Sequence, residues 1–151
     1  MELKDILDSN IISVGLEADS KEDALRKMSQ MLLENKNIDN VDQFVEDIFE
    51  REKIGVTGIG NGVAIPHGKS DSVKQVGIAI AVLKTPIKWE TLDGKDVKTI
   101  FLFCVSNEND AAHDHLFLLS KIAKKIADDE FLAKINSAKT VDEVLACVGG
   151  N

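Results

Sequence analysis

Val97-Lys-Thr-Ile-Phe-Leu-Phe-Cys-Val105 is one of two long, nearly continuous apolar segments in the chain. The other, residues 76–83, comes before it, and a break at Thr85-Pro86 and an Asp-Gly turn at residues 92–95 lie between them. Both segments have the length of a strand and are far too short to cross a bilayer. We therefore predict two strands here, with Cys104 as a buried core thiol.

Helical patterns flank these strands on both sides, and capping residues mark where several of the helices begin. The expected elements are, in chain order, a strand at 10–16, helices from Ser20 to about 36 and from Asn40 to about 52, strands at 63–65, 76–83 and 97–105, and helices from about Asp110, at 129–135 and from Thr140. Both helical groups need a sheet face to cover. We therefore predict an α/β fold, a three-layer α/β/α sandwich with the element order β-α-α-β-β-β-α-α-α.

The composition is typical of a soluble globular domain. The chain has 151 residues, 44% hydrophobic and 29% charged, with no internal repeat and no linker long enough to separate two domains. We predict that residues 1–151 form a single domain. The net charge of −8 argues against binding to nucleic acid or to anionic lipid surfaces. Two cysteines, and an N-terminus without the apolar segment of a signal peptide, favour a cytoplasmic protein that does not insert into a membrane.

A glycine-rich segment leads to the most informative side chain, His67. Residues 55–68 contain five of the ten glycines and end in Ile65-Pro-His-Gly68. Pro66 stiffens the backbone and Gly68 permits close approach, so the imidazole stands on a rigid loop with little side-chain cover. A neutral imidazole is a good phosphoryl acceptor near neutral pH, and glycine amides favour an anion. His67 is thus either a nucleophile, with its ring open to solvent and N–H or cationic donors around it, or a residue that caps a turn.

Other polar side chains have both a functional and a structural interpretation. Thr57 is either a turn residue or a phosphate contact, and Arg51 either faces the site or interacts with the C-terminal dipole of its helix. His113 and His115 have the spacing of an HxH metal pair. On a helix, however, two such residues point about 200° apart, which disfavours a shared metal ion. We expect one of these histidines to face a site and the other to face water.

These segments resemble those of a known family. Thr57-Gly-Ile-Gly-Asn-Gly-Val-Ala-Ile-Pro-His-Gly-Lys69 resembles the active-site segment of the fructose/mannitol-type enzyme IIA (EIIA type 2) of the bacterial phosphotransferase system (PTS). His115-Leu-Phe-Leu-Leu-Ser-Lys-Ile-Ala123 resembles the second histidine motif of that family, and the segments at 85–89 and 92–95 match in order. The resemblance extends from about residue 11 to residue 148. It implies a mixed sheet between helical layers, in agreement with the predicted order.

The resemblance also implies roles for single residues. His67 corresponds to the phosphorylated histidine, and His115 to the second active-site histidine, which is expected to contact the phosphoryl group. Arg51 corresponds to the arginine near the site at the end of the second helix. Thr57 and Gly58 correspond to loop positions expected to support the phosphate.

Partners follow from the same resemblance. The histidine phosphocarrier protein, HPr, would phosphorylate His67, and a IIB component (EIIB) would take the phosphoryl group to a sugar, of the fructose type, entering through a membrane IIC component (EIIC). No metal and no cofactor is expected, because the donor is already activated. Val56 stands where the family commonly has a serine, so a hydroxyl is missing there, and His113 has no counterpart and no assigned role.

Two other functions are compatible with the sequence. Nitrogen-type IIA proteins are very similar, including the Gly-Ile-Gly-Asn-Gly loop, and bind target proteins according to their phosphorylation state. The chain would then be a regulatory binding module and would feed no sugar permease. A small metal-dependent hydrolase is the third interpretation, and it predicts stoichiometric bound metal.

Overall fold

A mixed sheet lies at the centre of the computed structural model, which describes residues 3–108 and 111–150. Its strands are β1 (Ile12–Leu16), β2 (Gly58–Gly60), β3 (Val63–Ala64), β4 (His67–Lys69), β5 (Gly77–Ile87) and β6 (Val97–Val105). The order is β1-β5-β6-β3-β2, and β4 also pairs with β6. β5 and β6 are antiparallel, whereas β3 and β4 both run parallel to β6. The two long apolar segments are thus neighbouring central strands.

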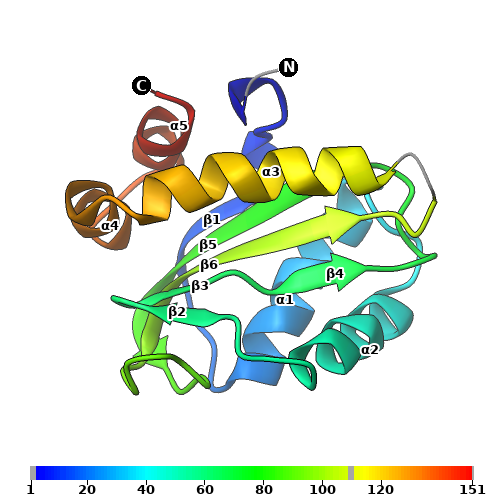
Figure 1. Cartoon of the computed structure of the whole chain (residues 1–151), viewed down its shortest axis with the longest axis horizontal. Helices are drawn as coiled ribbons and strands as arrows, with labels where there is room; N and C mark the ends of the chain where they lie inside the picture. Colours follow the sequence, from blue (N-terminus) through cyan, green and yellow to red (C-terminus); the bar gives the residue numbers. More distant parts are fainter. Residues whose placement is uncertain (1–2, 109–110, 151) are drawn as a thin grey trace.

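Helices cover both faces of this sheet and complete three layers (Figure 1). One face carries α1 (Lys21–Glu34) and α2 (Val41–Glu52), and the other carries α3 (Ala111–Ile126), α4 (Asp129–Asn136) and α5 (Val141–Gly149). The predicted α/β/α fold is confirmed. The helix start expected near Asp110 lies outside the described residues. Within the described ranges, none of the helices has the length and apolar character needed to cross a membrane.

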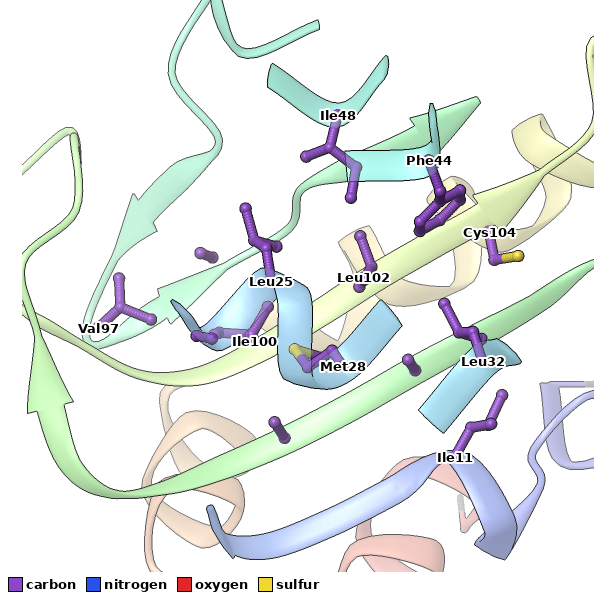
Figure 2. Packing of buried hydrophobic residues seen from close by; sticks show 14 of the residues in the cluster. Ile11, Leu25, Met28, Leu32, Phe44, Ile48, Val97, Ile100, Leu102 and Cys104 are labelled. Atoms are coloured by element: carbon purple, nitrogen blue, oxygen red, sulfur yellow. The ribbon is translucent and has the colours of Figure 1, made fainter. Parts of the chain in front are cut away.

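β6 divides the core in two, because successive side chains of a strand point to opposite faces. Ile100, Leu102 and Cys104 pack with α1 and α2 (Figure 2), and the residues between them pack with the helices on the other face. Every β6 residue from Thr99 to Val105 is completely buried, which explains the continuous apolar run. Burial raises the pKa of the Cys104 thiol to about 12, so this side chain is the unreactive core thiol that was predicted.

The predicted N-caps are confirmed and determine where the helices begin. Ser20 Oγ accepts a hydrogen bond from the Asp23 amide at 3.1 Å, and Asn40 Oδ1 accepts one from the Gln43 amide at 3.0 Å. Thr140 caps α5 in the same way. The cap of α2 matters most for the site, because the far end of this helix carries Arg51.

Two short strands were not predicted. β2 and β4 have three residues each and contain glycine, so neither has a run of alternating apolar side chains that would indicate a strand. Both are defined by pairing with a partner strand, β2 with β3 and β4 with β6. The fold class is unaffected, but β4 contains His67 and so decides the position of the site.

Candidate functional site

His67 is the first residue of β4 and lies opposite Phe103 of β6. β3 and β4 keep the same register against β6, since Val63 pairs with Thr99 and His67 pairs with Phe103. Pro66 interrupts the strand between them because it has no N–H, and its carbonyl accepts a hydrogen bond from the Phe103 amide at 3.0 Å. The Ile-Pro step therefore holds His67 at a defined point beside β6.

Strand alternation gives His67 and Gly68 opposite surroundings. His67 shares the face of Phe103, on the side of α3, whereas Gly68 lies opposite Cys104, on the side of α2. A Cβ atom at Gly68 would collide with the ring of Phe44 in α2. Glycine is required here because β4 and α2 approach so closely. This approach also brings the end of α2 toward the histidine.

His67 and His115 form a contacting pair of imidazoles. Their ring centroids are 5.1 Å apart in an edge-on arrangement, and Phe103 lies 5.0 Å from His67 and 6.1 Å from His115. The expectation that the His67 ring is open to solvent is wrong, since the residue is only 6% exposed. Contacts with Phe103 and with His115 on α3 cover it. The ring is thus closely covered by its neighbours and does not stand on a bare loop.

Three buried side-chain nitrogen or oxygen atoms in the described part of the chain have no hydrogen-bond partner, and two belong to this pair. They are His67 Nδ1, His115 Nε2 and Glu52 Oε2. Buried polar atoms are nearly always paired, because an unpaired one costs about 1–3 kcal/mol. Unpaired nitrogens on two adjacent imidazoles are typical of a site that receives a polar ligand. We infer that the pair is arranged for a group absent from the isolated chain.

Both imidazoles are held neutral. Burial lowers the pKa of His67 from its ordinary 6.5 to about 4, with smaller contributions from the charges of His115 and Arg51, while the nearby backbone of Ile65 acts in the opposite direction. Burial also lowers the pKa of His115, followed by the charges of Lys69 and Arg51. A neutral imidazole keeps a lone pair available for nucleophilic attack at and below neutral pH.

This lowered pKa predicts a specific pH dependence of stability. As the pH falls below 6.5, the unfolded chain takes up a proton on His67 while the folded chain does not until about pH 4, so the free energy of unfolding decreases. Between about pH 7.5 and pH 5.5, the free energy of unfolding measured in urea should therefore fall by about 1 kcal/mol more for the wild type than for His67→Gln. Equal losses in both proteins would contradict the lowered pKa. The comparison removes the contribution of the carboxylates, which both proteins share.

Arg51 is half-buried near the end of α2, where it acts on both histidines. Its positive charge contributes to the lowered pKa of His67 and of His115. Its Nη1 donates a long hydrogen bond, 3.4 Å, to the carbonyl of Gly55 in the loop that follows α2. The structure thus brings Arg51 toward the histidine pair and ties its guanidinium to this loop. Val56, in the same loop, is exposed.

Thr57 and Gly58 have structural contacts of their own. Thr57 is buried, and its hydroxyl donates to Glu52 Oε1 at 2.8 Å, so that proton is not available to a phosphate in this arrangement. The backbone carbonyl of Thr57 accepts from the Ile65 amide at 2.9 Å, two residues before His67. At Gly58, a Cβ atom would collide with Thr91 and with the Glu90 carbonyl. Both residues therefore anchor the loop beside the site.

Sequence reasoning missed three residues next to this loop: Lys21, Glu52 and Trp89. One signal was available. A lysine at the first position of a helix faces the positive end of the helix dipole, which disfavours it unless another group compensates. Trp89 contacts the loop directly, since its Nε1 donates to Thr57 Oγ1 at 3.3 Å.

The histidines of α3 differ as expected for residues two apart on a helix. His115 contacts His67, and His113 is exposed. Over residues 3–108 and 111–150, no three His, Cys, Asp or Glu side chains come together in a way that could hold a metal ion. The chemistry offered by this site is that of two neutral imidazoles with a guanidinium nearby.

The geometry defines a mixed α/β sandwich in which a buried histidine at the sheet edge contacts a second, half-buried histidine. A family model described as "Phosphoenolpyruvate-dependent sugar phosphotransferase system, EIIA 2" matches residues 5–149. The chain therefore belongs to the PTS EIIA type 2 family, whose members are phosphotransfer components, and the resemblance seen in the sequence is confirmed.

Known relatives of the chain include sugar-specific and regulatory proteins. It is 36% identical over 129 residues to the 2-O-alpha-mannosyl-D-glycerate-specific EIIABC component of Escherichia coli, covering 85% of this chain but only 20% of that protein. It is 33% identical to the mannitol-specific enzyme IIA component of Halalkalibacterium halodurans, covering 95% of this chain and 94% of the relative. The solved structure of nitrogen regulatory protein IIA-Ntr from Neisseria meningitidis has a TM-score of 0.86 at 32% identity, covering 96% of this chain and 97% of that one. Family membership thus leaves both sugar transport and regulation as possible roles.

Proposed function

We propose that His67 is the phosphoryl acceptor of a sugar phosphorelay. It would take the phosphoryl group from phospho-HPr and pass it to an EIIB component, for uptake of a fructose-type sugar through a membrane EIIC component. The observation that carries this proposal is the neutral, buried His67 in contact with His115, with an unpaired nitrogen on each ring. Residues 1–151 would form a single EIIA domain, which the family match over residues 5–149 supports.

The burial pattern of the ring nitrogens favours one site of attachment. Nδ1 of His67 is one of the buried, unpaired atoms of the described residues and Nε2 is not, so the phosphoryl group would attach at Nε2. In the transfer, one nitrogen–phosphorus bond forms at Nε2 while that of the donor breaks, and positioning with charge stabilisation supplies the catalysis. No metal or cofactor enters this step, because the donor phosphohistidine is already activated.

The neighbouring residues have distinct proposed roles. The unpaired Nε2 of His115 would form a hydrogen bond with a phosphoryl oxygen, and the Arg51 guanidinium would balance its negative charge. Thr57 and Gly58 would support the phosphate indirectly, by holding the loop against Glu52 and Thr91.

A reconstituted relay tests the proposal. Incubation with phosphoenolpyruvate, enzyme I and HPr should produce an acid-labile phosphoryl adduct that mass spectrometry places on His67. Adding a fructose-type EIIB should then move the phosphate to that partner. Failure of the wild-type chain to accept phosphate from phospho-HPr would overturn the proposal.

Regulation is the second candidate, favoured by the likeness to nitrogen regulatory IIA proteins. Phosphate would then still reach His67 but would not pass to EIIB components. The phosphorylated and unphosphorylated chains would instead retain different target proteins. The same reconstituted relay separates the two functions, because only the transport role predicts loss of the adduct when EIIB is added.

A further inference from the structure

Lys21 is buried to an unusual degree for a lysine at a helix start. Its side chain is only 14% exposed, and its Nζ lies 2.6 Å from Glu52 Oε1 and 3.2 Å from Glu90 Oε1. The same ammonium lies over the ring of Trp89, 4.9 Å from the centroid, and over that of Phe49 at 5.7 Å. These contacts compensate for the unfavourable helix dipole and join α1 to the end of α2.

Glu52 links Lys21 to the loop that follows α2. Its side chain is 6% exposed, and Oε1 accepts from both Lys21 and the hydroxyl of Thr57. Thr57 in turn accepts from Trp89 through its hydroxyl, and its backbone carbonyl holds the Ile65 amide. A continuous set of contacts therefore leads from Lys21 to the residue that precedes the Pro66-His67 step.

The same contacts fix the surroundings of Arg51. This residue is the direct neighbour of Glu52 at the end of α2, and its guanidinium bonds to the Gly55 carbonyl within the loop that Thr57 closes. The loop is held at one end by α2 and at the other by Glu52. Displacement of the Glu52 side chain would release the loop and the carbonyl that holds Arg51.

We propose that Lys21 is a positioning residue for phosphoryl transfer, acting through Glu52 and Thr57 to hold the loop 53–57 and the Arg51 guanidinium against the histidine pair. This inference rests on the proposed function of His67. A buried ion pair is by itself weak support for stability, because removing two charges from water costs about as much as their attraction returns. Fixed geometry is what this ion pair supplies to the loop.

Rate measurements on matched variants test the proposal. Lys21→Met and Glu52→Gln should each lower the maximal rate of phosphorylation by phospho-HPr about ten-fold, less than outright loss of a phosphate contact, because Arg51 is displaced rather than removed. The HPr concentration at half-maximal rate should stay nearly constant. Lys21→Arg should restore most of the rate. The control is Lys27→Met, also on α1, because the Lys27 Nζ contacts Asp23 and the Glu17 carbonyl.

A titration followed by NMR gives a readout that a purely structural role would not move. Loss of the nearby Arg51 charge should raise the pKa of both His67 and His115. Lys21→Met removes a positive charge and Glu52→Gln removes a negative one, so a rise in both variants cannot be a direct charge effect. The titration also requires only the folded, unphosphorylated chain.

The outcomes separate the two proposals. If the wild type accepts phosphate on His67 while Lys21→Met matches it in rate and in histidine pKa, the role of Lys21 is overturned and the function of His67 stands. If the wild type accepts no phosphate, the proposed function fails, whatever the titrations show. Should Lys21→Met fold poorly, Lys21→Arg and Glu52→Gln decide the question, because a wild-type rate and unchanged histidine pKa values in folded Glu52→Gln would likewise overturn the proposal.

Discussion

His67→Gln is expected to take up no phosphate from phospho-HPr under conditions in which the wild type is fully modified. Glutamine fills a similar volume and can form hydrogen bonds, but its amide nitrogen has no lone pair available for attack on phosphorus. The effect should therefore be complete rather than partial. Mass spectrometry of the intact chain, before and after acid treatment, measures the adduct directly.

The control for this prediction is the fold of the variant. His67 lies opposite Phe103 and packs against its ring, so His67→Gln should be compared with the wild type by thermal unfolding and by its NMR spectrum. A folded His67→Gln that still carries an acid-labile phosphate would remove His67 from the proposed role. The phosphate would then have to be located on another side chain by peptide mapping.

Replacing His115 by alanine should slow the same reaction by about two to three orders of magnitude, the usual effect of losing one donor to a developing negative charge. The buried Nε2 of His115 has no hydrogen-bond partner among the described residues, so we expect its hydrogen-bonding capacity to serve a phosphoryl oxygen. His67 remains in this variant, so the adduct should still form, slowly, on the same residue. Single-turnover kinetics with phospho-HPr measure the loss.

His113→Ala provides the matched control, since this histidine is two residues away on α3 and exposed. This variant should accept phosphate from phospho-HPr at the wild-type rate. His115 is also one of the charges that lower the pKa of His67, so His115→Ala should raise that pKa in an NMR titration. A His115→Ala variant with the full rate would mean that the contact between the two rings has no part in the transfer.

Local sequence patterns predicted most of the fold, because capping and hydrophobic periodicity act over a few residues. Ser20 and Asn40 cap the helices they were expected to cap, and the apolar run at Val97–Val105 is the strand it was expected to be. β2 and β4 escaped prediction for the opposite reason. Each is a segment of three residues that includes glycine, has no strand preference of its own and becomes a strand only by pairing.

The site was only partly predictable. The Ile-Pro-His-Gly setting singled out His67 as a candidate nucleophile, and the resemblance to EIIA proteins indicated His115 and Arg51. The burial of His67 did not follow, because it depends on Phe103 and on α3, which come later in the chain. The partner of the Thr57 hydroxyl was missed as well, since its acceptor, Glu52, is oriented by a lysine on another helix.

Residue identity alone determined which groups are present: an imidazole after a proline, a second one on a helix, and an arginine at the end of another helix. Tertiary structure decided their state. The pairing of β4 with β6 and the packing of α3 place the two rings 5.1 Å apart and exclude water from His67, which keeps its pKa near 4. Proton affinity depends on solvent and on neighbouring charges, and both are set by residues that are distant in the chain and meet only when it folds.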